Sequence, residues 1–119
     1  MQWIGTWRNQ YGSLLTIAQA ADHRLAGTFR TALPDSGFYG QDVPVTGLYQ
    51  GDCIRFAFAH TGAKGGAIAS FTGLVRDGKI ETIWHVVADP GSQPGAAKAS
   101  VRDWAHAVMT NADTFERVG

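Results

Sequence analysis

This chain of 119 residues has little of what several common protein chemistries need. Its single cysteine, Cys53, excludes an intrachain disulfide and a cysteine-based zinc cluster. Its 10 basic and 10 acidic residues cancel, which argues against a general nucleic-acid binder, because phosphate neutralisation supplies most of the affinity of such proteins. No apolar run approaches the roughly 20 residues of a membrane-spanning helix, so no membrane partner is expected. Four histidines lie far apart without metal-ligand spacing, and we expect them at the surface or at a subunit interface: His23, His60, His85 and His106.

Glycine and tryptophan, in contrast, are plentiful. The 15 glycines and many β-branched residues favour short strands joined by tight turns, and four tryptophans are a large aromatic load for one core. The length suits one domain, residues 1–119. We expect eight strands at hairpin spacing: Ile4–Asn9, Ser13–Gln19, Arg24–Thr31, Val43–Tyr49, Cys53–Ala59, Ala67–Val75, Lys79–Val87 and Thr110–Val118.

The connections between these segments carry turn signals. Asp77-Gly78 is a strong hairpin signal, and Leu33–Asp42 and Gly62–Gly66 are predicted as loops. Lys98–Met109 is predicted as a short helix, because its apolar residues recur at helical spacing. The predicted fold is therefore all-β, an eight-stranded antiparallel up-and-down barrel with a short helix before the last strand. Closing such a barrel removes exposed edges and leaves room for one small ligand.

Alternation along the strands predicts which side chains face the interior. Ile80, Thr82, Trp84 and Val86 share one face, and so do Ile54, Phe56 and Phe58, and Ser13, Leu15 and Ile17. The opposite face carries Ile83 and Val87, which suggests a subunit interface. With Trp84 inside, its neighbour His85 points outward, so a hydrolytic triad of His85 with Ser13 and Asp113 is not expected. We therefore expect neither an enzyme nor a cofactor.

Five short motifs, in order, resemble the avidin and streptavidin family. They are Gly5-Thr6-Trp7-Arg8-Asn9-Gln10-Tyr11-Gly12-Ser13, Leu25-Ala26-Gly27-Thr28-Phe29, Ala69-Ser70-Phe71-Thr72-Gly73, Ile80-Glu81-Thr82-Ile83-Trp84 and Asp113-Thr114-Phe115. Each is weak alone, but together they span residues 5 to 118. The resemblance implies an eight-stranded barrel that binds biotin at one end, usually as a homodimer or homotetramer. It also implies a secreted or periplasmic protein, although Met1-Gln2-Trp3 shows no signal peptide and leaves the cytoplasm open.

The resemblance also implies roles for individual residues. Asn9 and Ser13 match donors to the ureido oxygen of biotin, and Thr31 and Asp113 match acceptors of its N–H groups, the carboxylate making the stronger bond. Further positions match the pocket walls or the loop expected to close over the ligand: Phe58, Phe71, Trp84 and Leu33. Trp104 sits near a tryptophan that tetrameric members lend to a neighbouring pocket, although helix packing or an interface is the more ordinary role for it.

Several positions depart from the family pattern. Phe29 replaces a tyrosine whose hydroxyl is a third ureido-oxygen donor, a loss of roughly 1–3 kcal/mol or one to two decades in affinity. Tyr11 shares a face with Asn9 and Ser13 and is a candidate to compensate. Phenylalanines at two walls and alanines at Ala67 and Ala69 reduce wall area and polar contacts. We therefore expect weaker biotin binding, or a preference for another ligand.

Two alternatives stay open at this point. In one, the same barrel binds a different small apolar or lipid-like molecule. In the other, the barrel is an oligomeric interaction module whose interior is filled by Phe29, Phe56, Phe58 and Phe71. A filled interior has no cavity, whereas either binding protein has one, so the structure separates these readings.

Overall fold

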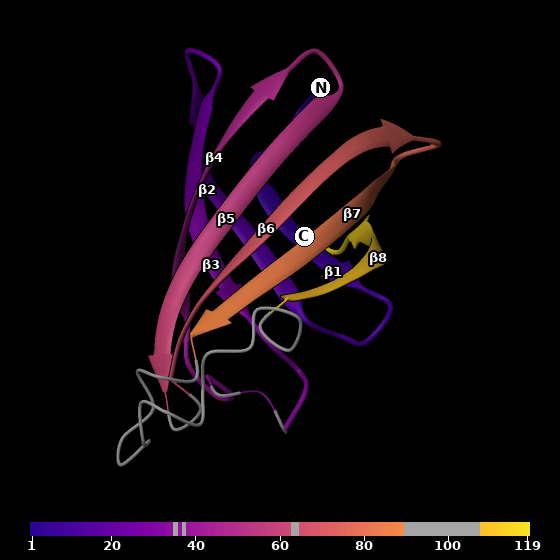
Figure 1. Ribbon diagram of the computed structural model, residues 1–119. Helices are drawn as coiled ribbons and strands as arrows, with labels where there is room; N and C mark the ends of the chain where they lie inside the picture. Colours follow the sequence, from indigo (N-terminus) through magenta and orange to yellow (C-terminus); the bar gives the residue numbers. More distant parts are fainter. Residues whose placement is uncertain (35, 37, 63–64, 90–107) are drawn as a thin grey trace.

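The computed structural model describes residues 1–34, 36, 38–62, 65–89 and 108–119. Eight β-strands account for most of them: β1 (Gly5–Asn9), β2 (Leu14–Ala21), β3 (Arg24–Arg30), β4 (Val43–Gln50), β5 (Cys53–Gly62), β6 (Gly65–Arg76), β7 (Lys79–Asp89) and β8 (Val108–Arg117). Each strand pairs antiparallel with its neighbour in sequence. The barrel closes where β1 pairs with β8, Trp7 lying opposite Arg117 and Asn9 opposite Phe115 (Figure 1). The predicted eight-stranded up-and-down barrel is confirmed.

Tight turns join the strands at one end of the barrel. In the β6–β7 hairpin, Asp77 and Gly78 both have positive φ, 52° and 75°, as a two-residue type I′ turn requires. The β2–β3 hairpin uses the same conformation at Asp22 and His23, with φ of 54° and 65°. Both turns twist with the flanking strands, which supports the register of the long hairpins.

Two predicted segments differ from the structure. The loop predicted over Gly62–Gly66 is wrong in extent, because β5 continues to Gly62 and β6 begins at its partner, Gly65. Cross-strand pairing here overrides the low strand propensity of glycine. The helix predicted over Lys98–Met109 lies mostly outside the described residues, and its last two residues, Val108 and Met109, begin β8 and pair with Val87 and Val86. No helix occurs among the described residues.

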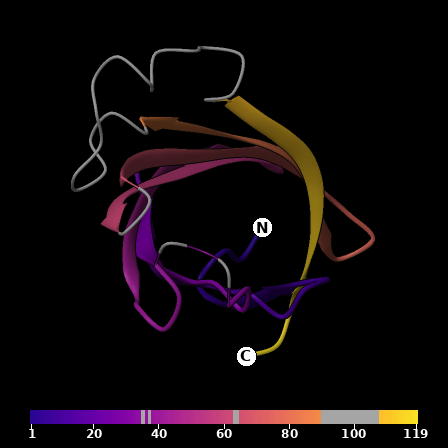
Figure 2. The ribbon, with the colours of Figure 1, turned by 60° about the horizontal axis from the view of Figure 1, so that its bottom comes forward.

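Aromatic side chains close the end of the barrel at which β1 begins. Trp3 and Trp7 are both buried, and the indole Nε1 of Trp7 donates to the carbonyl of Trp3 at 3.0 Å. The guanidinium of Arg117 lies over the Trp7 ring, 4.3 Å from its centroid. Figure 2 looks along the barrel and shows the N-terminal segment crossing its interior. This aromatic plug leaves the other end as the entrance to the interior.

Two further properties of the described residues bear on function. Within them, no helix is long and apolar enough to cross a membrane. The same residues contain no group of three or more His, Cys, Asp or Glu side chains arranged to hold a metal ion.

Candidate ligand-binding site

A cavity of about 370 Å³ opens at the end of the barrel where strands β1, β3, β5 and β7 end. A volume of this order suits one small organic molecule. It is lined by Asn9, Tyr11, Ser13, Phe29, Thr31, Leu33, Ser36, Phe38, Phe58, His60, Gly65, Ala67, Ala69, Phe71, Trp84, Val86, Ala88, Met109 and Asp113. Every site residue predicted from the sequence is in this set except Trp104, which lies outside the described residues. Whether these residues contact a ligand stays a prediction.

Asn9 and Asp113 form the polar inner end of the cavity. The side-chain oxygen of Asn9 accepts from the backbone N–H groups of Tyr11 at 3.1 Å and Ser13 at 2.9 Å. This fixes the amide so that its Nδ2 donates to Asp113 Oδ2 at 3.1 Å. Gln10 Nε2 donates to the other carboxylate oxygen at 2.9 Å, and Thr82 Oγ1 donates to the Asp113 carbonyl at 2.8 Å. The carboxylate is therefore held from several sides before any ligand arrives.

Ser13 lies just before β2 and Thr31 just after β3, and both line the same cavity as this pair. Each hydroxyl oxygen accepts one backbone N–H: Ser13 Oγ from Ala32 at 2.9 Å and Thr31 Oγ1 from Leu33 at 3.2 Å. Both residues are buried, which confines their remaining hydrogen-bonding capacity to the cavity side. The turn residue Tyr11 also lines the cavity, with 53% of its surface exposed.

These four residues keep hydrogen-bond donors and acceptors that their contacts within the protein do not use. Within the described part of the chain, Asn9 keeps one amide N–H and Ser13 keeps its hydroxyl proton, so both can donate. Asp113 accepts one side-chain bond on each oxygen and keeps lone pairs on both, and Thr31, like Ser13, keeps a hydroxyl proton and one lone pair. A donor at Asn9, an acceptor at Asp113 and two hydroxyls that can donate or accept suit a carbonyl oxygen flanked by N–H groups, as in a cyclic urea or amide.

Aromatic rings form the walls outside this polar end. Phe29 stacks on Phe58 with centroids 4.7 Å apart, and Phe56 stacks on Phe71 at 4.6 Å. Trp84 lies 6.2 Å from Phe71 on the neighbouring strand. These rings come from β3, β5, β6 and β7, at the inward positions that alternation predicts, so the predicted faces are confirmed. They offer flat apolar surfaces to a ligand ring.

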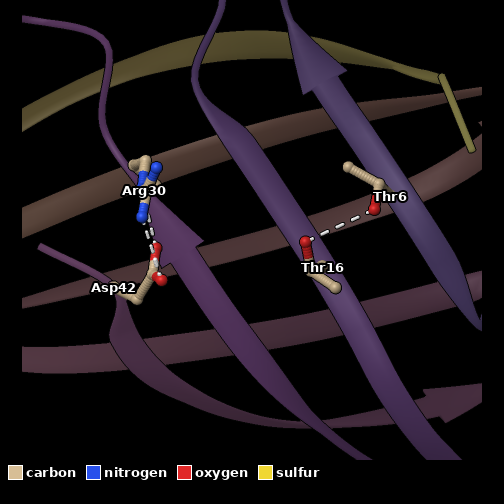
Figure 3. A network of polar contacts seen from close by, with 4 residues as sticks. All are labelled: Thr6, Thr16, Arg30 and Asp42. Carbon is tan, nitrogen blue, oxygen red and sulfur yellow. Dashed lines mark hydrogen bonds and ion pairs between the residues drawn. The ribbon is translucent and has the colours of Figure 1, made fainter. Parts of the chain in front are cut away.

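The β3–β4 connection adds Phe38, a buried residue that the sequence reading did not single out. Its ring lies 5.4 Å from Phe58 in an edge-on arrangement and 4.3 Å from the ring of His60. Figure 3 shows the base of this connection, where Arg30 donates to Asp42 through two nitrogens, at 2.8 and 3.1 Å. This exposed ion pair is worth little in stability, but it joins the two ends of the loop that carries Phe38.

The same view shows a second polar contact, away from the loop. Thr6 on β1 and Thr16 on β2 bring their hydroxyls within 3.4 Å of each other, and the two residues are direct cross-strand partners. Their neighbours Trp7 and Leu15 are buried in the interior, so the threonine pair lies on the outer side of the same strands. The contact supports the β1–β2 register that sets Asn9 and Ser13 on either side of the turn.

His60 corrects the expectation that the histidines lie at the surface or at an interface. It lies in β5 opposite Ala67, and its side chain lines the cavity. Burial lowers the pKa of its imidazole below the ordinary value of 6.5. The prediction failed because the predicted strand ended at Ala59, whereas β5 continues for three more residues, to Gly62. Continuing the alternation of Ile54, Phe56 and Phe58 would have placed His60 inside.

Two buried side-chain polar atoms lack a hydrogen-bond partner among the described residues: His60 Nδ1 and Trp84 Nε1. Both belong to residues that line the cavity. Buried polar groups without partners are uncommon, and each one costs about 1–3 kcal/mol. Because both atoms belong to residues of one cavity, a ligand bound there could supply the hydrogen bonds that they lack.

The cavity also excludes the reading of a barrel filled by phenylalanines. Phe56 does pack the deeper interior, where it stacks on Phe71 and where Ile80 and Phe115 are fully buried. Phe29 and Phe58 instead form walls, because the residues across from them on β6 and β7 are small or of moderate size: Ala67, Ala69, Val86 and Ala88. The interior is thus packed at one end and hollow at the other.

A closed barrel whose cavity has a polar inner end and aromatic walls is typical of proteins that bind small ligands. The chain belongs to the avidin family, whose model matches residues 1–118. This is a family of non-enzymatic binding proteins.

Individual relatives agree with this assignment. Afifavidin from Afifella pfennigii is 31% identical over 96 residues, a match that covers 76% of this chain and 60% of afifavidin. The bradavidin2–biotin complex has a TM-score of 0.76 at 20% identity, with both chains fully covered. The complex of short afifavidin with biotin has a TM-score of 0.73 at 24% identity and covers 96% of this chain and 87% of the other. Apo shwanavidin has a TM-score of 0.76 at 21% identity, covering 100% and 98%. At these identities the structures show a common fold.

Proposed function

We propose that this chain binds biotin, or a molecule with the same cyclic-urea head, reversibly and without covalent chemistry. The observation that carries the proposal is the hydrogen-bonding capacity left at Asn9, Ser13, Thr31 and Asp113. Its donors and acceptors are held by backbone and side-chain bonds, so little ordering is needed when a ligand binds. Family membership and two biotin complexes among the structural relatives support the same ligand.

Affinity is expected to fall below that of a pocket with a third oxygen donor. Phe29 offers only carbon to the ligand, and the exposed hydroxyl of Tyr11 is the nearby candidate to replace that donor. A Tyr11→Phe variant tests this compensation, because it removes the hydroxyl alone. Unchanged affinity in this variant would eliminate the role for Tyr11.

Isothermal titration with biotin tests the proposed function directly. We expect one site per chain and a rise in melting temperature, because a ligand that binds only the folded state stabilises it. Absence of both heat and a melting shift at millimolar biotin would contradict the proposal.

One observation favours a second ligand class. The outer walls on β6 and β7 are alanine and valine, which suit an apolar molecule that makes no polar contacts there. Competition separates the two ligand classes. If biotin displaces a bound fluorescent apolar probe, the result supports the urea-binding site. If the probe binds and biotin fails to bind, the result supports the apolar alternative.

We further propose that the chain forms a homodimer or homotetramer through the outer face of β6–β8. In this surface Ile68, Val87 and Val108 lie in one cross-strand row, and Ile83 lies in another. Ile83 is 69% exposed, and an apolar cluster of this kind is typical of an interface. A secreted or periplasmic location is part of the same proposal, and cell fractionation tests it.

A further inference from the structure

Among the described residues, His60 is the one ionisable side chain that lines the outer part of the cavity on its β5–β7 side. Along β6 and β7, the described lining residues outward of Trp84 are apolar: Ala67, Ala69, Val86 and Ala88. His60 on β5 faces this wall as the direct partner of Ala67. Ser36 in the β3–β4 connection adds a hydroxyl to the lining. A polar group on the outer end of a ligand would therefore meet His60.

The packing of His60 leaves it ready for such a group. The ring is held against Phe38 at 4.3 Å, and its Nδ1 is buried with no partner among the described residues. A half-turn of the ring exchanges the positions of Nδ1 and Cδ2 with little change in shape, so either edge can present the nitrogen. A bound acceptor would supply the hydrogen bond that the free protein lacks.

In the part of the chain that the structure describes, the other charged groups lie away from His60. Among the described lining residues, Asp113 and Tyr11 are the other titratable groups. Asp113 is in lateral register with Thr82, Gly73 and Ile54, whereas His60 lies much further along β5. In the β3–β4 connection Asp42 is ion-paired with Arg30 at the surface, and on β7 the exposed Asp89 lies opposite Gly66.

We propose that His60 recognises an anionic group on the outer end of the ligand and takes up a proton when that group binds. The inference rests on the proposed function, since the urea head must occupy the Asn9–Asp113 end. It adds a specificity residue and a pH dependence to that function. Ligands with a carboxylate tail are thereby favoured over uncharged analogues under mildly acidic conditions.

The direction of the pH effect follows from the two states of the imidazole. In the free protein, burial holds the pKa of His60 below 6.5, so the ring is neutral at neutral pH. A carboxylate within about 4–6 Å raises the pKa by about one unit or more, because it stabilises the charged form. Affinity for the carboxylate ligand therefore rises as the pH falls through the bound-state pKa, and it levels off below the free-state pKa. The window ends near pH ~4.3, where the ligand carboxyl itself takes up a proton.

The experiment compares biotin with biotin methyl ester, which has the same head and an uncharged tail. Both are titrated calorimetrically between about pH 8 and pH 5. We expect the biotin-to-ester affinity ratio to rise about tenfold on acidification, equivalent to one pKa unit. Titration in two buffers of different ionisation heat counts the protons taken up on the unaltered chain, so the test does not depend on whether a variant folds.

Matched variants assign the effect to His60. His60→Asn keeps a polar side chain but cannot take up a proton, and it should flatten the ratio. His23→Asn is the control, because His23 lies in the β2–β3 turn at the closed end and asparagine tolerates its positive φ. A flat ratio without proton uptake in the unaltered chain, or a pH dependence that survives in His60→Asn, overturns the inference while leaving biotin binding intact. Failure of both ligands to bind at any pH overturns the proposed function and this inference with it.

Discussion

At the scale of single residues, the cavity combines fixed polar groups with unused bonding capacity. Asn9 illustrates this: its side-chain oxygen is committed to two backbone N–H groups, so its amide N–H groups point to Asp113 and to the cavity side. Gln10 fixes the same carboxylate and also accepts from the backbone of Thr114. Such support makes the geometry of the polar end a property of the free protein, which lowers the ordering cost of binding.

Asp113→Ala should weaken biotin binding by about 10- to 100-fold. The change removes a charge-assisted bond to a ligand N–H, worth about 1.5–3 kcal/mol, and releases Asn9 and Gln10 from their partner. Calorimetric titration measures the change in Kd. Asp52→Ala is the matched control, because Asp52 is exposed in the β4–β5 turn and the hydrogen bond that the structure shows for it uses its backbone carbonyl, which accepts from Val75. Equal affinities for the two variants would exclude Asp113 from the site.

Phe29→Tyr should have opposite effects on the free and the bound protein. Phe29 is buried against Phe58, so an added hydroxyl without a partner destabilises the free fold by about 1–3 kcal/mol. When a urea oxygen is present the hydroxyl acquires an acceptor, and biotin affinity should rise about tenfold. Denaturant unfolding and titration measure the two effects. Weaker biotin binding in Phe29→Tyr would mean that the ligand oxygen does not lie near this ring.

At the scale of the strands, close backbone approach limits which residues the sheet accepts. Gly27 on β3 pairs with Ile17 just before a bulge in β2, and a Cβ at Gly27 would overlap the Thr16 carbonyl and reach its carbon at 2.8 Å. This contact is with backbone, which cannot turn aside. The motif that contains Gly27 is therefore a structural requirement of the barrel as well as a family signature.

Gly27→Ala should destabilise the fold by more than about 2 kcal/mol, because strands β2 and β3 must move apart. Gly78→Ala is the comparison: its φ is +75°, but nothing lies within 4 Å of the added Cβ, so only about 1 kcal/mol of backbone strain is expected. Urea unfolding midpoints with unchanged slopes give both values. A smaller loss at Gly27 than at Gly78 would show that the strands adjust easily.

Prediction of elements from the sequence succeeded where the signal was local. The Asp77-Gly78 turn and the alternation in Lys79–Val87 both appear as expected in the β6–β7 hairpin. Strand ends were less predictable, since Gly62 and Gly65 are strand residues only because they pair with each other across a hairpin. Because β5 extends past Ala59, His60 lies in the wall of the cavity and not at the surface.

At the scale of the whole molecule, the barrel has a sealed end, a hollow end and an apolar side. The plug of Trp3, Trp7 and Arg117 uses both chain termini, and the backbone N–H of Thr6 donates to the carbonyl of Gly119 at 3.0 Å. Sealing one end with the termini leaves the opposite connections to shape the cavity. The apolar side lies on the outer face of β6–β8, whereas the cavity lies inside the barrel, so the proposed assembly and the proposed ligand binding would use different surfaces.

Ile83→Lys should reduce the oligomeric mass, because a charged side chain would be buried without a partner in the interface. Light scattering on the eluting protein measures the mass at micromolar concentration. Ile4→Lys is the control, since Ile4 is comparably exposed but lies at the closed end of the barrel. A monomeric unaltered chain, or an unchanged mass in Ile83→Lys, would contradict the proposed interface.

The amino-acid sequence by itself determined the barrel and the polar residues of its inner end. Strand alternation and turn conformations are local properties, so eight hairpin-spaced segments with Asn9, Ser13 and Asp113 in family motifs were sufficient to predict both. Only the tertiary structure decided that the interior is hollow at one end and that Phe38 and His60 join its walls. Cavity volume depends on how side chains from all eight strands and a loop pack together, and no single segment of the sequence contains that sum.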